Sequence, residues 1–253
     1  MLQTVAALGW PALVAMGIGG VIIGFSKTSF GGLGAVAVAL FAWGMPAKES
    51  TAAVLLLLLV GDAVALFFYG RNVQWRLLLR LVPSVLPGLV LGAIFMQHVD
   101  DDTMRRAIGI ILLGMLAIQL WQRRRRPTEN TPAPKPNTAV TVAAGAAAGF
   151  TTMTANAAGP VMALYLLAQR FDKARFLSTN AWFFALVNLT KVPFTAALGL
   201  FTPTVLTIDV LYIPTVLLGT ALGRAVIRRV TQNQFEMATL AATGIAAVAV
   251  LVR

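Results

Sequence analysis

The sequence predicts an all-α, polytopic membrane protein made of two inverted five-segment repeats, with interrupted helices or hairpins meeting near the bilayer midplane. Three observations predict this fold class: the composition, a duplication of the chain and the placement of the basic residues. Of the 253 residues, 58% are hydrophobic and 11% are charged, and the mean hydropathy is +0.81. Because a soluble domain carries about 25% charged residues, this chain cannot cover a water-facing surface.

Nearly charge-free segments recur along the whole chain. A helix needs about 20 apolar residues to cross the ~30 Å hydrocarbon layer of a bilayer. The apolar segments are 5–24, 31–46, 50–69, 77–97, 104–121, 138–168, 177–208, 210–223 and 237–252. No lysine or arginine precedes the first segment, which therefore lacks the basic start of a cleavable signal peptide. We expect it to be a retained span.

The two halves of the chain match one another in order. An offset of 125 places 24–34 on 149–159, and each stretch begins with Gly-Phe-Ser or Gly-Phe-Thr. Offsets of 128 and 131 give two further matches: Ser50 and Thr51 with Ser178 and Thr179, and Pro83, Gly88 and Gly92 with Pro214, Gly219 and Gly223. The glycine spacing of the last match permits close helix packing. The duplication predicts a first transmembrane repeat at 1–122 and a second at 138–253, joined by a basic, proline-rich linker at 123–137.

The basic residues predict how the two repeats are oriented. Of the 20 lysines and arginines, fourteen fall on one side of the predicted spans: Arg71, Arg76, Arg80, Arg123, Arg124, Arg125, Arg126, Lys135, Arg170, Lys173, Arg175, Arg224, Arg228 and Arg229. The positive-inside rule makes this side and the linker cytoplasmic, and it places the loop at 98–106 on the periplasmic side. The repeats are then inverted and both termini are periplasmic. The net charge of +11 follows from this topology, and we expect no nucleic-acid partner.

Each repeat contains a polar interruption within its apolar sequence. The first interruption is GFSKTSFGG at 24–32, and the second is TTMTANAAGP at 151–160. Irregular backbone survives at membrane depth only where it is buried in protein or lines a wet cavity. Matching interruptions in inverted repeats are typical of a transporter's central binding site. Because the segment at 31–46 is short, the interruptions are either the tips of hairpins or tight polar turns between two full spans.

These stretches supply the candidate substrate-binding residues. Lysine provides positive charge for an anion, and hydroxyl and amide groups are suited to its oxygens. The candidates are Ser26, Lys27, Thr28, Ser29, Gly31, Gly32, Thr151, Thr152, Thr154, Asn156, Asn188 and Lys191. Asn188 and Lys191 share a helix face at i, i+3. An alternative for Lys27 is that its side chain reaches the interface from a helix end.

Asp62 is a carboxylate within the apolar segment 50–69, and we expect it to act in coupling or gating. The alternative is a buried ion pair between Asp62 and a lysine that orders the helices. Two lysines against one aspartate leave one positive charge unpaired, which favours an anionic substrate.

The two interruptions, the Ser-Thr pair before the next span and the Pro-x4-Gly-x3-Gly pattern resemble the TauE/SafE family of sulfite and organosulfonate exporters. The resemblance covers nearly the whole chain. It implies a bacterial inner-membrane permease that moves sulfite, sulfoacetate or related sulfur oxyanions, usually outward.

We therefore expect a secondary transporter that exports a small sulfur-containing anion, without enzymatic activity, cofactor or metal, in contact with the lipid bilayer and compatible with a homo-oligomer. Proton-coupled import of a similar anion, which rests on Asp62, is the first competing hypothesis. A second is an intramembrane hydrolase with a serine–lysine dyad at Ser26 or Ser29 and Lys27, and a third is a non-transporting subunit of a larger complex.

Overall fold

The described part of the protein is helical throughout and contains no strand. The structure is a computed structural model, and it describes residues 8–29, 34–124, 138–168, 171 and 173–226. The helices, in chain order, are α2 (Trp10–Thr28), α3 (Gly34–Gly44), α4 (Ala47–Tyr69), α5 (Trp75–His98), α6 (Asp101–Arg124), α7 (Thr138–Ala155), α8 (Gly159–Ala168), α9 (Lys173–Ala197) and α10 (Pro203–Val226). The all-α part of the predicted fold class is confirmed.

Four of these helices are long and apolar enough to cross a membrane by length and composition. They are Trp10–Thr28, Ala47–Tyr69, Trp75–His98 and Pro203–Ala225. Large apolar side chains on their outer faces are exposed, including Phe67, which is 81% exposed, and Val210, which is 71% exposed. Such faces suit hydrocarbon rather than water, so the chain is a multi-pass membrane protein.

The helices α3 and α8 are too short to cross a bilayer alone. They have 11 and 10 residues, which is about 15–17 Å at 1.5 Å per residue, or half of the ~30 Å hydrocarbon layer. Each follows a longer helix, α2 or α7, after an interruption. These lengths fit the arms of a hairpin better than two full spans.

One predicted segment boundary is wrong. The apolar pattern predicts a boundary at Asp209, between segments 177–208 and 210–223. In the structure α9 ends at Ala197, Gly199 has a φ of +68°, and α10 begins at Pro203. Glycine adopts positive φ without strain and proline is favoured in a first helical turn, so these two residues mark the turn. Asp209 therefore lies inside α10.

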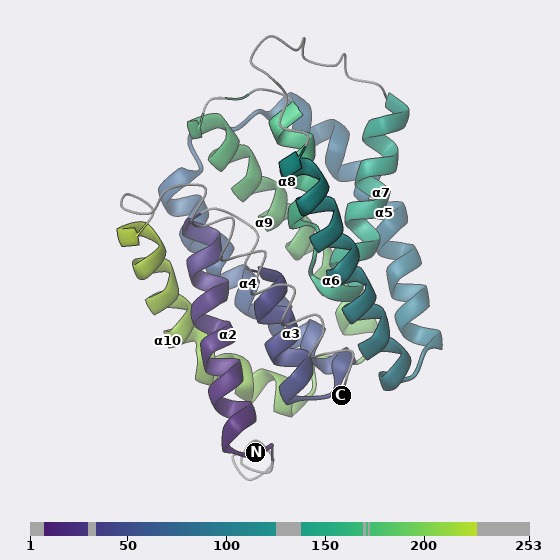
Figure 1. Ribbon diagram of the computed structural model, residues 1–253, viewed down its shortest axis with the longest axis vertical. Helices are drawn as coiled ribbons and strands as arrows, with labels where there is room; N and C mark the ends of the chain where they lie inside the picture. The colour runs from purple at the N-terminus through teal and green to yellow at the C-terminus, as the bar shows by residue number, and fades with distance from the viewer. Residues whose placement is uncertain (1–7, 30–33, 125–137, 169–170, 172, 227–253) are drawn as a thin grey trace.

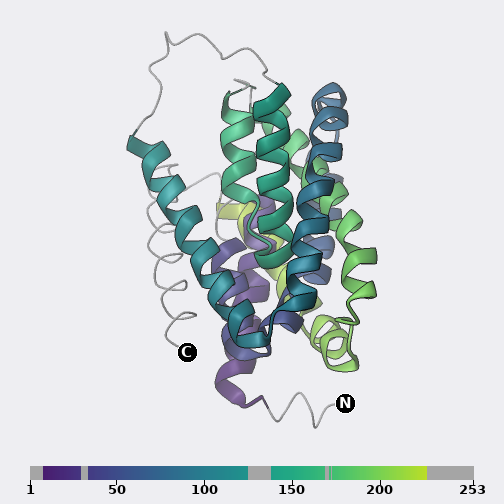
Figure 2. The ribbon, with the colours of Figure 1, turned by 90° about the vertical axis from the view of Figure 1, so that its right-hand side faces the viewer.

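Helices from the two halves of the chain pack against each other very closely. A Cβ atom on Gly24 of α2 would lie 1.9 Å from the carbonyl oxygen of Val216 on α10. A Cβ atom on Gly149 of α7 would lie 2.2 Å from the carbonyl oxygen of Val85 on α5. The same holds on the facing helices at Gly88 and Gly219, which confirms the predicted close packing there. Figures 1 and 2 both show α5 (blue) beside α7 (teal).

The helices α2 and α7, which the repeat pairs, enter the molecule from opposite ends. In Figure 1, α2 rises from the N-terminal end at the bottom of the view, whereas α7 descends from the top. At the interruption that follows α7, Asn156 is half-buried and Ala157 and Ala158 are buried, so the second interruption lies inside the molecule.

Candidate functional site

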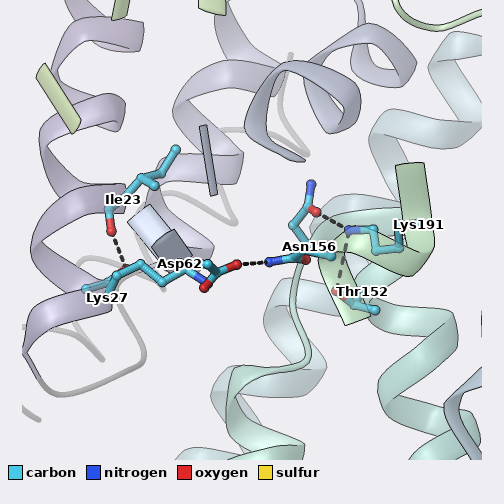
Figure 3. Close-up of polar contacts among 8 residues, drawn as sticks. Ile23, Lys27, Asp62, Thr152, Asn156 and Lys191 are labelled. Carbon is cyan, nitrogen blue, oxygen red and sulfur yellow. Dashed lines mark hydrogen bonds and ion pairs between the residues drawn. The ribbon is translucent and has the colours of Figure 1, made fainter. Parts of the chain in front are cut away.

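The first cluster of buried polar groups joins α2, α4 and α9. Lys27 lies in the last turn of α2, and its Nζ atom is 2.6 Å from Oδ1 of Asp62 on α4. Asn188 of α9 donates from Nδ2 to Oδ2 of the same carboxylate at 2.7 Å. The Lys27 ammonium also lies over the ring of Phe184, 4.6 Å from its centroid. Figure 3 shows the Lys27–Asp62 contact.

This cluster bears on two of the alternatives drawn from the sequence. The buried ion pair that was the alternative for Asp62 is present, and its partner is Lys27. The Lys27 side chain is 10% exposed and points to Asp62, so the alternative in which it reaches the membrane interface is wrong for this structure. Because both oxygens of Asp62 accept hydrogen bonds, the charge of Lys27 is already neutralised.

The second cluster joins α7 and α9 at the second interruption. Lys191 of α9 is 1% exposed. Its Nζ atom is 3.5 Å from Oγ1 of Thr152 and donates to Oδ1 of Asn156 (Figure 3). Both partners are neutral, and within the described ranges no carboxylate lies at ion-pair distance from Lys191. A buried ammonium with only neutral partners is costly, which makes this position unusual.

Asn156 organises the second cluster because it ends α7 and connects two other helices. Its φ of 48° is in the left-handed region, which asparagine tolerates better than most residues. The N–H of Asn156 donates to the carbonyl of Thr152, which closes the last turn of α7. Its side chain accepts from Lys191 on α9 and donates to the carbonyl of Thr51 on α4 at 3.0 Å.

Five hydroxyl groups of the two interruptions donate to backbone carbonyls. Most of them donate one turn back along their own helix: Ser26 to Ile23, Ser29 to Phe25, Thr151 to Ala147 and Thr154 to Phe150, at 2.6–2.9 Å. Thr28 donates to the carbonyl of Thr220 on α10 at 2.9 Å. An anion could use these hydroxyls as donors only after they rotate away from the carbonyls.

The structure thus brings most of the candidate residues to one region. Asn188 and Lys191 lie one turn apart on α9, so the first cluster (Lys27, Asp62, Asn188) and the second cluster (Lys191, Thr152, Asn156) are neighbours. Gly31 and Gly32 lie outside the described residues. In the described part no group of three or more His, Asp or Glu side chains is placed to hold a metal ion.

Two buried polar groups, one within the second cluster and one outside both clusters, were missed in the sequence. The Thr51 carbonyl has no sequence signal, because any residue supplies a carbonyl. Asp209 does have a signal: it is the one carboxylate in the otherwise apolar sequence 203–223. The apolar pattern places it at a segment boundary, although it is 5% exposed within α10.

Long apolar helices that enclose two lysines and a carboxylate define a multi-pass membrane protein of the transporter class, because ionisable groups inside a membrane mark substrate or ion pathways. The family model described as "Sulfite exporter TauE/SafE" matches residues 16–250. The chain belongs to this family, and the resemblance in the sequence is confirmed. Comparison with curated proteins and with solved structures gives no match.

Proposed function

We propose that this protein is a secondary transporter of the bacterial inner membrane that exports a small sulfur-containing anion, such as sulfite or an organosulfonate. The family supports the sulfur anion and the outward direction. The single observation that carries the binding site is the burial of the Lys191 side chain, whose Nζ atom has only the neutral partners Thr152 and Asn156 among the described residues.

The two lysines have different roles at this site. Lys27 is paired with Asp62, whereas no described carboxylate lies at ion-pair distance from Lys191. Because a buried charge is stabilised only by an opposite charge or by several hydrogen bonds, an entering anion gives Lys191 the partner it lacks. The anion then lies between the two interruptions, next to Asn188. Asp62 gates the site, since breaking its contact with Lys27 frees a second ammonium for the anion.

The start of α8 adds to the attraction for an anion. This helix begins at Gly159, three residues beyond Asn156. The first N–H groups of a helix are unpaired and the positive end of its dipole lies there, so a helix start inside the molecule favours bound negative charge. A sulfur oxyanion offers several oxygens to accept from this helix start, from Lys191 and from the rotated hydroxyls of Thr151 and Thr154.

The proposed topology has inverted repeats, a cytoplasmic linker at 123–137 and periplasmic termini. Two features support it: α2 and α7 enter from opposite ends (Figure 1), and α2 packs on α10 as α7 packs on α5 through glycines. A negative-inside membrane potential drives an anion outward, worth about 2.3 kcal/mol per charge per 100 mV. Export therefore needs no cofactor or ATP hydrolysis.

Anion flux from proteoliposomes tests this function. Vesicles with purified protein are loaded with sulfite, and its release is followed under an imposed potential that is negative inside. Wild type is expected to release sulfite well above empty vesicles, and Lys191→Met is expected to fall to the empty-vesicle rate. Lys48→Met is the matched control, because Lys48 lies at the start of α4; it is expected to behave as wild type. Equal rates for wild type and Lys191→Met would remove Lys191 from the site.

A further inference from the structure

Asp209 is a buried carboxyl group that has no partner among the described residues. It lies in α10 and is 5% exposed, and within the described part of the chain neither of its carboxylate oxygens has a hydrogen-bond partner or any appreciable contact with solvent. Val205, Tyr212 and Val216, at i−4, i+3 and i+7 on the same helix face, are buried as well. The carboxyl group thus belongs to the packed side of α10 rather than to its lipid-facing side.

The helices that pack around Asp209 carry several charged and titratable groups. The helix α10 packs on α2 and α4, whose titratable groups and those of α10 itself are Lys27, Lys48, Glu49, Asp62, Tyr69, Tyr212 and Arg224. None of them has a hydrogen bond or ion pair with Asp209. Tyr212 donates its hydroxyl to the carbonyl of Leu13 at 2.7 Å.

The level of Asp209 in the membrane follows from the packing of α10. A Cβ atom on Gly61, the residue before Asp62, would lie 2.9 Å from Cγ of Lys27 and 3.8 Å from Cγ1 of Val216. Val216 is therefore level with the Lys27–Asp62 pair. Asp209 comes seven residues earlier, about 10 Å along the axis at 1.5 Å per residue. It lies between the central pair and the end of the molecule at which α10 begins.

We propose that Asp209 is a proton-binding site that takes up and releases one proton in each transport cycle, an inference that rests on the proposed transport function. A buried carboxylate with neither a cation nor a donor costs several kcal/mol, so in this conformation the group carries a proton. In an alternative conformation that wets this part of α10 from one side of the membrane, the proton leaves to that water and the carboxylate is solvated. The group then takes up a proton from water on the other side before it is buried again, so that one proton crosses in each cycle. Asp62 differs, because Lys27 and Asn188 stabilise it as a carboxylate.

The backbone of α10 can bend next to Asp209. Pro214 lies inside the helix and has no N–H, so the carbonyl of Val210 lacks its helical hydrogen bond. Bends in helices concentrate at such positions. Movement of the helix start about Pro214 would therefore change the packing of the segment that carries Asp209.

Infrared spectroscopy of the purified protein tests the protonated carboxyl group without any transport. Wild type is expected to show a carbonyl stretching band of a protonated carboxylic acid near neutral pH. Asp209→Asn is expected to lose this band, and Asp209→Glu, which keeps a carboxyl group, is expected to shift it. Asp102→Asn is the matched control at an exposed position in the first turn of α6, and it should leave the band unchanged. A band that survives Asp209→Asn unchanged would overturn the proposal, whether or not the protein transports sulfite.

Proton movement in proteoliposomes tests the role in the cycle. A pH-sensitive dye inside the vesicles reports the protons that move with sulfite. Wild type and Asp102→Asn are expected to move protons in step with sulfite. Asp209→Asn is expected to move no protons with sulfite, and its sulfite flux is expected not to vary with pH. An unchanged proton-to-sulfite ratio in Asp209→Asn would contradict the proposal. If wild type moves no sulfite, the proposed function fails, and the infrared result alone decides on Asp209.

Discussion

Lys27 and Asp62, from helices α2 and α4, form an ion pair of 2.6 Å in which both side chains are largely buried. Asn188 of α9 holds the second oxygen of Asp62 at 2.7 Å. The pair therefore fixes three helices around one carboxylate. One turn further along α9, Lys191 has no such carboxylate in the part of the chain that the structure describes, and this difference between the two lysines underlies the account of the site.

The Lys27–Asp62 pair is expected to be needed for folding as well as for transport. Lys27→Gln or Asp62→Asn alone leaves one buried charge without its partner, which costs about 3–5 kcal/mol. The double variant has neither charge and is expected to lose less than the sum of the two single variants. Thermal unfolding in detergent measures all four proteins. If the two losses simply add, the two side chains do not stabilise each other.

A carboxylate at position 156 is expected to stop transport. Asn156→Asp keeps a residue that tolerates φ of 48° and places a carboxylate beside Lys191, but it cannot donate to the Thr51 carbonyl as the Asn156 amide does. Because the new ion pair and the lost hydrogen bond act in opposite directions, we expect Tm to change little, together with loss of sulfite flux because the new carboxylate competes with the anion. A variant that transports sulfite at the wild-type rate would show that Lys191 does not bind it.

The close approach of α2 and α10 makes Gly24 sensitive to the smallest side chain. A methyl group there would meet the backbone of α10 at 1.9 Å, which no side-chain rotation relieves, so Gly24→Ala is expected to lower Tm strongly or to prevent folding. In α6, Gly114 has nothing within 4 Å of an added Cβ. Gly114→Ala is the control, and it is expected to be neutral or to gain up to about 1 kcal/mol from helix propensity. Equal effects of the two substitutions would contradict the close packing.

Asp100 caps the start of α6, and its ionisation is expected to stabilise the fold. Two hydrogen bonds from Thr103 to the carboxylate hold the pKa of Asp100 below its ordinary value of 3.8. The larger effect comes from the Thr103 hydroxyl, and the next from its backbone N–H, which lies 2.8 Å from Oδ1 of Asp100. Because the pKa is lowered in the folded protein, the stabilisation is fully present above pH 3.8 and is lost as the pH falls through the folded pKa. Asp100→Asn keeps a capping side chain but is expected to lack this acid-dependent loss in thermal unfolding between neutral pH and about pH 3. An identical pH profile for wild type and Asp100→Asn would exclude this role.

Much of the fold was accessible from the sequence, because membrane helices leave strong signals. Length and apolarity predicted the long spans, and the glycine spacing at 88 and 219 predicted the close packing that the structure contains. The boundary predicted at Asp209 is wrong because one charge interrupts the apolar run without ending the helix. The turn is instead set by Gly199 and Pro203, whose backbone preferences outweigh the polarity of one side chain.

The pairing within the site was less accessible. The sequence indicated Lys27, Lys191 and Asp62, and it left open which lysine pairs with the aspartate. That choice depends on the register of α2 against α4, which brings Gly61 against the stem of Lys27. The hydrogen bonds from the serine and threonine hydroxyls to carbonyls one turn earlier in the same helix were also not predicted, because these side chains donate equally well to a ligand or to the preceding turn.

The central claim is that sulfite binds at Lys191, and equilibrium binding of radiolabelled sulfite to purified protein tests it most directly. This measurement does not depend on the direction of transport, on its coupling to other ions or on leakage of vesicles. Wild type and Lys48→Met are expected to bind sulfite with the same affinity, and Lys191→Met is expected to bind none in the same concentration range while unfolding cooperatively. Binding of sulfite by Lys191→Met with wild-type affinity would contradict the account.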